Sequence, residues 1–193
     1  MAVLARYHEF FVGDLRLARA IQSLSSPWIT QLMVFVSALG SGWPAFAIVV
    51  AIAITLIAAG LKTEGVICLA GLGVGRLVTS LLKLASGRAR PGDALLQLGG
   101  SFHELSFPSG HAIFFMELFG FLFFLTYSLA KPGVLRAAAL VILTTLIVLV
   151  GVSRIYLGAH WPSDVLGGYL AGGLWLMLMI ETYKAAVARK QTD

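Results

Sequence analysis

Three short polar segments in this otherwise apolar chain combine histidine with arginine, lysine, serine and aspartate. They are Lys83 with Arg90 and Pro91, the run Pro108-Ser109-Gly110-His111, and Ser153-Arg154 with His160 and Asp164. Arginine can clamp the oxygens of an anion with two parallel hydrogen bonds, and lysine adds a compact positive charge. Imidazole can attack phosphorus or donate a proton to a leaving oxygen. These residue types are the ones that cleavage of a phosphate ester requires.

The cations and one helix start are expected to bind the phosphate. Lys83, Arg90 and Arg154 are suited to hold its oxygens through the transition state. A helix that begins near Ser109 would offer free backbone N–H groups and the positive end of its dipole. Gly110 then allows close approach of the anion, and Ser109 adds a hydroxyl group.

The two histidines are predicted to have different roles. Asp164 follows His160 by four residues, and Pro162 is suited to the first turn of a helix, so the carboxylate can reach back to one ring nitrogen. Such a partner fixes the tautomer and stabilises the imidazolium form. His160 is therefore the predicted nucleophile. His111 has no acid nearby in sequence and is the predicted general acid.

At these residues the chain resembles the type 2 phosphatidic acid phosphatase (PAP2) family, which belongs to the lipid phosphatase superfamily related to vanadium haloperoxidases. The three segments match the family motifs Lys-x6-Arg-Pro, Pro-Ser-Gly-His and Ser-Arg-x5-His-x3-Asp in order, over a core of about residues 83–169. The resemblance implies an α-helical bundle, a phosphohistidine intermediate and no required metal or other cofactor. It also implies active-site roles for the residues already named: Lys83, Arg90, Ser109, Gly110, His111, Arg154, His160 and Asp164.

Composition predicts a membrane setting for these motifs. Hydrophobic residues make up 59% of the 193 positions and charged residues only 12%, and the mean hydropathy is +0.90. A bilayer core is crossed by about 20 apolar residues in a helix. Four stretches approach that length, namely residues 65–82, 111–130, 134–152 and 165–180. We expect one all-α domain over residues 1–193, a polytopic transmembrane bundle.

A fifth span is predicted to be compound. Residues 28–59 are apolar but are interrupted at Gly40-Ser41-Gly42-Trp43-Pro44, where a new helix would start at Pro44. Residues 1–27 then form an interfacial amphipathic segment on the outer side. The alternative is six spans, with residues 21–39 crossing on their own and the N-terminus in the cytoplasm. Five spans are favoured because Ser23, Ser25, Ser26 and Pro27 leave too short an apolar run.

Lysine and arginine accumulate at the cytoplasmic ends of spans, which orients the bundle. One face would carry Lys62, Lys131, Arg136, Lys184, Arg189 and Lys190. The motif loops lie on the opposite face. This pattern predicts a protein of the cell (inner) membrane whose site faces the periplasm or exterior.

Two charged residues fall inside the apolar stretches, where an ionisable group without a partner is costly. Arg76 lies seven residues inward of Lys83, and Glu117 lies six residues inward of His111. Helical rise puts both about 9 to 10 Å below the catalytic face. Equal depth predicts an Arg76–Glu117 ion pair or hydrogen bond between adjacent spans.

Other residues are expected to be structural. Cys68 is predicted to be a small buried hydrophobe, and no metal site is predicted. Solvated or interfacial positions are predicted for His8, His103, Asp14 and Glu104. Close helix packing is predicted for Gly71, Gly73 and Gly75 and for the pair Gly168 and Gly172.

The function predicted from these residues is hydrolysis of a phosphomonoester or diphosphate of a lipid. Undecaprenyl diphosphate, phosphatidic acid, phosphatidylglycerol phosphate and a lipid A phosphate all fit, and a polyprenyl diphosphate or glycerophospholipid is favoured. The expected partners are the phosphorylated lipid and the bilayer, without nucleic acid or an obligatory protein partner. Three alternatives stay open: a lipid phosphotransferase using the same site, a non-catalytic lipid-binding or transport protein, and a vanadate-dependent haloperoxidase.

Overall fold

The fold consists of helices over the described part of the chain. The computed structural model describes residues 11–24, 26–91 and 105–192, and within them it contains seven helices and no strand. They are α2 (Asp14–Gln22), α3 (Pro27–Leu39), α4 (Gly42–Ala58), α5 (Lys62–Ser86), α6 (Gly110–Leu129), α7 (Val134–Tyr156) and α8 (Pro162–Thr192). The predicted all-α class is confirmed.

The membrane-spanning elements agree with the five-span prediction. Helices α5, α6, α7 and α8 are each long and apolar enough to cross a bilayer, and α3 with α4 makes a fifth span if this pair, bent by 61°, counts as one. The alternative sixth span over residues 21–39 is not formed, because α2 ends at Gln22 and α3 begins only at Pro27. The second half of the broken span begins at Gly42, two residues before the predicted Pro44.

Helix boundaries follow from local sequence. Pro27 occupies the first turn of α3, where its missing N–H is tolerated, and the Ser26 hydroxyl accepts a hydrogen bond from the Ile29 N–H at 3.3 Å. Helix α5 stops at Gly87, whose positive φ of 59° favours glycine. Helix α8 begins at Pro162, as predicted.

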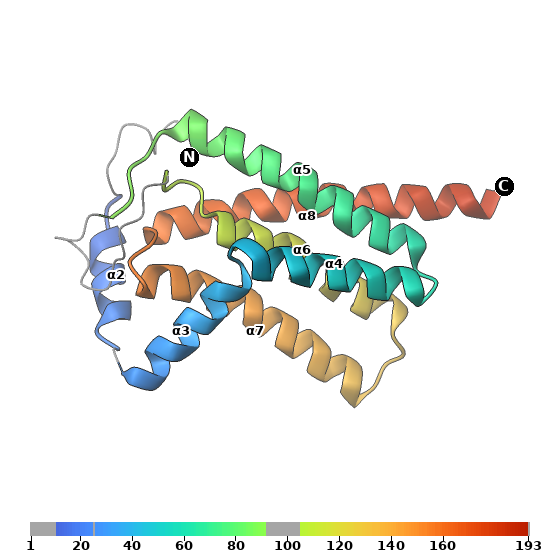
Figure 1. Ribbon diagram of the computed structural model, residues 1–193, viewed down its shortest axis with the longest axis horizontal. Coiled ribbons are helices and arrows are strands. Elements are labelled where there is room, and N and C mark those ends of the chain that lie inside the picture. Colours follow the sequence, from blue (N-terminus) through green and yellow to red (C-terminus); the bar gives the residue numbers. More distant parts are fainter. Residues whose placement is uncertain (1–10, 25, 92–104, 193) are drawn as a thin grey trace.

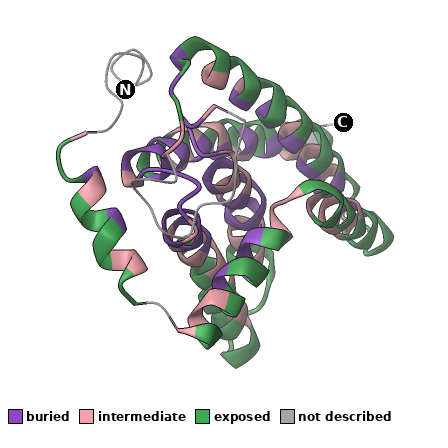
Figure 2. Cartoon of the chain, turned by 60° about the vertical axis from the view of Figure 1, so that its left-hand side comes forward, coloured by how far each residue is buried: buried purple, intermediate pink, exposed green. Residues whose placement is uncertain are grey.

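Helix α6 is the centre of the bundle. It packs against α5, α7 and α8. Half of the residues in its most apolar stretch are buried, compared with 11% in the corresponding stretch of α7. Buried residues gather where the helices face one another, while the outer surfaces are exposed and apolar, as expected next to lipid (Figure 2). Cys68 lies in this core at 0% exposure, as predicted.

Glycine allows α8 to approach α6 closely. A Cβ on Gly168 would lie 2.7 Å from the Ser109 carbonyl oxygen, and one on Gly172 would lie 3.0 Å from the Ile113 backbone. The packing predicted for this pair is confirmed, and so is that of Gly71 and Gly75, which face side chains of α8 and α6. The prediction is wrong for Gly73, which has no neighbour within 4 Å among the described residues.

The polar segments meet at one end of the bundle, which we call the site end (Figure 1). There α5 ends, α6 begins, α7 gives way to α8, and the short helix α2 lies across the end against α7 and α8. The α4–α5 and α6–α7 connections and the C-terminal part of α8 lie at the other end (Figure 1).

Candidate active site

A cavity of about 1010 Å³ reaches into the bundle near the site end. Six of the eight predicted catalytic or phosphate-binding residues line it: Lys83, Arg90, Gly110, His111, Arg154 and His160. They come from the C-terminal end of α5, the segment that follows α5, the first turn of α6, the end of α7 and the loop that follows α7. The remaining two, Ser109 and Asp164, are fully buried behind this lining.

His160 is held through its contact with Asp164. The Nδ1 atom of His160 lies 3.8 Å from Oδ2 of Asp164, with both side chains at 1% exposure or less. Between them lies Ser106, whose hydroxyl donates to the same Asp164 oxygen at 2.5 Å and is 3.5 Å from His160 Nδ1. The predicted reach of the carboxylate to the ring is therefore present, with a serine hydroxyl bridging the gap. Because Nδ1 faces Asp164, Nε2 is the nitrogen available for attack.

The surroundings of His160 keep it neutral. Burial lowers its pKa from 6.5 to about 4, the hydrogen-bonded Asp164 opposes this shift, and Arg90 and Arg154 add to the lowering. A neutral imidazole at ordinary pH has a free lone pair, which is what a nucleophile needs.

His111 is held by a different element, the break between α3 and α4. The Ser41 hydroxyl lies 2.9 Å from Nε2 of His111. Gly40 lies so close to the ring that a Cβ there would be 2.7 Å from His111 Cδ2. The bend of the broken span thus fixes the second imidazole, because a straight helix with larger residues would not fit against it.

Two arginines of the site, Arg154 and Arg90, are anchored by hydrogen bonds to α3 and to the loop between α7 and α8. Arg154, which is 5% exposed, donates from Nη1 to the Ser37 hydroxyl at the end of α3. Arg90 donates from Nη1 to the Ala159 carbonyl at 3.2 Å, next to His160. These bonds orient two guanidinium groups toward a single cavity that also contains both imidazoles. The arrangement can surround a tetrahedral anion with cations, a nucleophile and a proton donor.

Comparison with known proteins gives the family. The sequence model of the PAP2 superfamily matches residues 64–188, well over half of the chain. The chain belongs to the PAP2 superfamily. It is therefore a phosphatase of a family of membrane lipid phosphatases, and an integral membrane protein.

Individual relatives cover different shares of this PAP2 chain. It is 29% identical to phosphatidylglycerophosphatase B of Bacillus subtilis over 92% of the chain and 86% of that protein. It is 36% identical to the lipid A 1-phosphatase of Rhizobium johnstonii, but over only 53% of the chain and 41% of that protein.

Two solved structures share the fold. The crystal structure of the PAP2-type phosphatidylglycerolphosphate phosphatase from Bacillus subtilis matches with a TM-score of 0.76 at 27% identity, over 90% of this chain and 86% of the other. That of Aquifex aeolicus LpxE matches with a TM-score of 0.71 at 24% identity, over 90% of this chain and 98% of the other.

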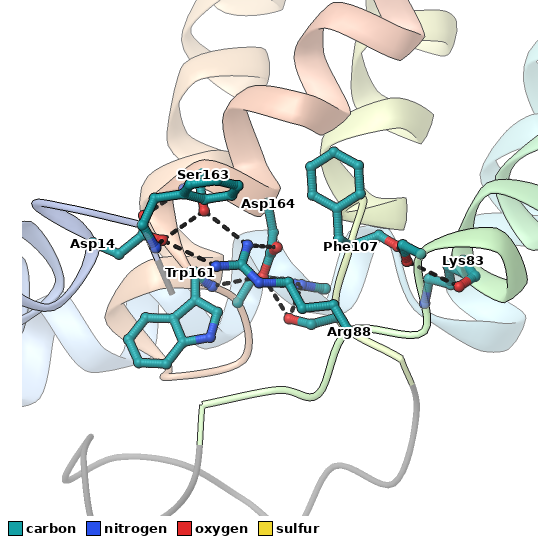
Figure 3. A network of polar contacts seen from close by, with 11 residues as sticks. Asp14, Lys83, Arg88, Phe107, Trp161, Ser163 and Asp164 are labelled. Carbon is teal, nitrogen blue, oxygen red and sulfur yellow. Dashed lines mark hydrogen bonds and ion pairs between the residues drawn. The ribbon is translucent and has the colours of Figure 1, made fainter. Parts of the chain in front are cut away.

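The PAP2 motifs are supported by a buried polar network that the sequence did not predict (Figure 3). Arg88 donates from Nη1 to Asp164 Oδ1 at 2.5 Å, and its Nη2 lies 3.2 Å from Asp14 Oδ2. Asp14 also accepts hydrogen bonds from the backbone and the hydroxyl of Ser163, at 2.9 and 2.6 Å. The network therefore runs from α2 to the carboxylate beside His160.

Asp14 corrects a prediction. We expected it to be solvated, but it is 4% exposed, because Arg88 and Ser163 supply the charge and the donors that a buried carboxylate needs. Arg88 lies between Lys83 and Arg90 of the first motif, and Ser41 lies in the break between α3 and α4, but no local sequence pattern marks either as a site residue. His8, His103 and Glu104 lie outside the described residues.

The predicted Arg76–Glu117 pair is not formed. Oε1 of Glu117 is buried with no hydrogen-bond partner among the described residues, and the carboxylate packs against Gly75 of α5, where a Cβ would be 2.4 Å from it. Arg76 Nη1 instead lies 4.0 Å from the position that a Cβ on Gly110 would take, at the first turn of α6. The two residues share a depth by their Cα atoms, but the long arginine side chain extends toward the site end.

Proposed function

We propose that this PAP2 chain hydrolyses a phosphomonoester or diphosphate of a lipid through a phosphohistidine at His160, with His111 as general acid. The observation that carries the proposal is that two imidazoles with separate partners, Asp164 with Ser106 for one and Ser41 for the other, line one cavity with Lys83, Arg90 and Arg154.

In the first step, Nε2 of His160 attacks phosphorus and the bond from phosphorus to the leaving oxygen breaks. His111 gives its proton to that oxygen, so the lipid alcohol or lipid phosphate leaves neutralised. The phosphorylated imidazole keeps its Nδ1 proton and carries positive charge, which Asp164 stabilises at 3.8 Å.

In the second step, water attacks the same phosphorus atom and the P–N bond breaks. His111, now neutral, takes the proton of the water molecule, and phosphate leaves with His160 neutral again. The cations and the first turn of α6 bind the phosphoryl oxygens in both steps. The Ser109 hydroxyl, buried without a partner among the described residues, is suited to donate to one of these oxygens.

We infer that no metal ion is required, because the three motif cations of the cavity, Lys83, Arg90 and Arg154, can stabilise the transferred charge. No group of three or more His, Cys, Asp or Glu side chains that could hold a metal ion occurs in the described ranges. The metal independence that we propose is measurable as activity that persists in EDTA.

We infer that the site faces the periplasm or exterior. Six cations outside the motifs lie at the other end of the bundle, namely Lys62, Lys131, Arg136, Lys184, Arg189 and Lys190, and there Lys190 donates to Thr63 at 2.6 Å across the ends of α8 and α5. They outnumber Arg16 and Arg19, which lie on α2 at the site end. Basic residues at the end opposite the site favour the cytoplasm.

The relatives support a lipid substrate, since they are phosphatases of phosphatidylglycerophosphate and of lipid A. The test is phosphate release by the purified protein in detergent with EDTA, on undecaprenyl diphosphate, phosphatidic acid, phosphatidylglycerol phosphate, a lipid A phosphate and, as a soluble control, glucose 6-phosphate. We expect lipid substrates to be cleaved far faster than glucose 6-phosphate.

Rapid quench with phosphorus-labelled substrate should trap label on His160. Label that is found on His111, or that persists in His160→Ala, would overturn the assignment of roles. Label that passes to a second lipid with little free phosphate would identify a phosphotransferase instead.

A further inference from the structure

Arg76 is a cation of the cavity that none of the three motifs includes. It lines the cavity and precedes Lys83 by seven residues, about two helical turns, so both project from the same face of α5. Arg76 Nη1 and Lys83 Cε each lie 4.0 Å from the position that a Cβ on Gly110 would take. Because both distances are measured from the same point, Arg76 Nη1 and Lys83 Cε are no more than 8.0 Å apart. The guanidinium therefore lies beside the proposed phosphate site.

Nothing in the described part of the chain neutralises this guanidinium. Its side chain makes no hydrogen bond or ion pair with a described residue. Glu117, the nearest candidate by depth, packs against Gly75, and its Cα lies seven residues or about 10 Å along α6 from Gly110. An arginine within an apolar span is costly unless it finds an anion or water. A ligand in the cavity can supply that anion.

The scissile phosphate does not need a fourth cation. A phosphomonoester carries a charge of about −1.5 to −2 near neutral pH, and Lys83, Arg90 and Arg154 already provide three positive charges in the cavity. The cavity, at about 1010 Å³, has room for more than one phosphate, and its deeper wall is apolar, with Val49, Leu72 and Phe114. A lipid chain fits that wall, which leaves Arg76 next to the part of the headgroup between the chain and the scissile phosphate.

We propose that Arg76 forms a second anion subsite, which binds a second phosphate group of the lipid substrate. The inference rests on the proposed function and narrows it to a lipid with two phosphate groups close together. Two sources have this chemistry: a lipid diphosphate, and a phosphomonoester whose leaving group contains a phosphodiester. A lipid with one phosphate, such as phosphatidic acid, leaves the subsite without an anion.

The kinetic test compares three substrates: a polyprenyl diphosphate, phosphatidylglycerol phosphate and phosphatidic acid. Arg76→Gln is expected to lower kcat/KM for at least one two-phosphate substrate by about tenfold more than for phosphatidic acid, because a charge-assisted bidentate contact is lost. The substrate that shows the larger loss identifies the source of the second phosphate. Arg76→Lys keeps the charge and should restore part of the difference. Arg136→Gln, a cation at the other end of the bundle, is the matched control.

Equal loss on all three substrates would mean that Arg76 acts on the scissile phosphate, which all three share, and would overturn the proposal. A binding test does not depend on turnover. In His160→Asn, inorganic pyrophosphate or glycerol 1,3-bisphosphate should raise the Tm more than orthophosphate does, and Arg76→Gln should abolish that difference. If neither probe shows an advantage that depends on Arg76, the subsite is refuted. If the wild-type protein cleaves no lipid phosphate while the binding difference holds, the proposed function fails and the subsite stands.

Discussion

The two imidazoles of the cavity differ in their partners, and this difference supports their division of roles. His160 is 1% exposed and has a carboxylate behind Nδ1. His111 is half-buried at the first turn of α6 and has only the neutral Ser41 hydroxyl at 2.9 Å. A carboxylate stabilises the positive charge of a phosphorylated ring, whereas the neutral Ser41 hydroxyl only fixes the orientation of the other ring.

At this scale we predict the titration of His160. Its lowered pKa means that the ring stays neutral as the pH falls through 6.5 and gains its proton only near pH 4. NMR of the ring carbon-bound protons in detergent, assigned by comparison with His160→Asn, should give a midpoint near 4. Arg90→Gln removes one cause of the lowering and should move the midpoint upward. A midpoint at or above 6 in the wild-type protein would contradict the burial argument.

Two elements outside the motifs hold the site residues in place: the break between α3 and α4, and the short helix α2. The bend at Gly40 and Ser41 brings α3 and α4 against His111, and α2 brings Asp14 to Arg88. Neither element carries a PAP2 motif. Both act by presenting one polar side chain to a motif residue, so each can be tested by a single substitution.

Ser41→Ala is expected to lower kcat by about fivefold, because the loss of one hydrogen bond to the proton donor is worth about 1 kcal/mol. The deficit should shrink on p-nitrophenyl phosphate, whose leaving group needs no proton, and Ser41→Thr should restore activity. Ser23→Ala removes an exposed hydroxyl at the C-terminal end of α2 and serves as the control. An equal deficit on both kinds of leaving group would argue against an action through His111.

Asp14→Asn should destabilise the protein by about 3 kcal/mol, because it leaves the buried Arg88 charge with only one carboxylate. Phosphoenzyme formation should slow as well, since Arg88 also holds Asp164. Thermal unfolding in detergent and single-turnover kinetics measure the two effects. Arg16→Gln changes an exposed charge of the same helix and should alter stability by no more than about 0.5 kcal/mol. Equal effects from the two variants would show that the network is not important.

At the scale of the whole molecule, the features that could be predicted from the sequence are the membrane spans, which the bilayer requires to be apolar, and the residues of the local motifs. Spans are visible because a helix in lipid must be apolar over about 20 residues. The motif residues were predictable as a set because each lies at a span end on one face. The Asp14–Ser163 and Ser41–His111 contacts join residues 149 and 70 positions apart, and no local pattern encodes them. The Arg76–Glu117 prediction was wrong because depth along a helix says nothing of how far a long side chain extends.

The orientation of the bundle is the last prediction at this scale. In a Cys68→Ser background, which removes the one native cysteine, Ala89→Cys marks an exposed position at the site end and Lys131→Cys an exposed position at the other end. A membrane-impermeant maleimide applied to intact bacterial spheroplasts should label position 89, and should label position 131 only after the membrane is permeabilised. The positive residues at the far end are the physical reason, since they resist translocation. Labelling in the reverse order would place the cavity in the cytoplasm, and its substrate would then have to be presented from the inner leaflet.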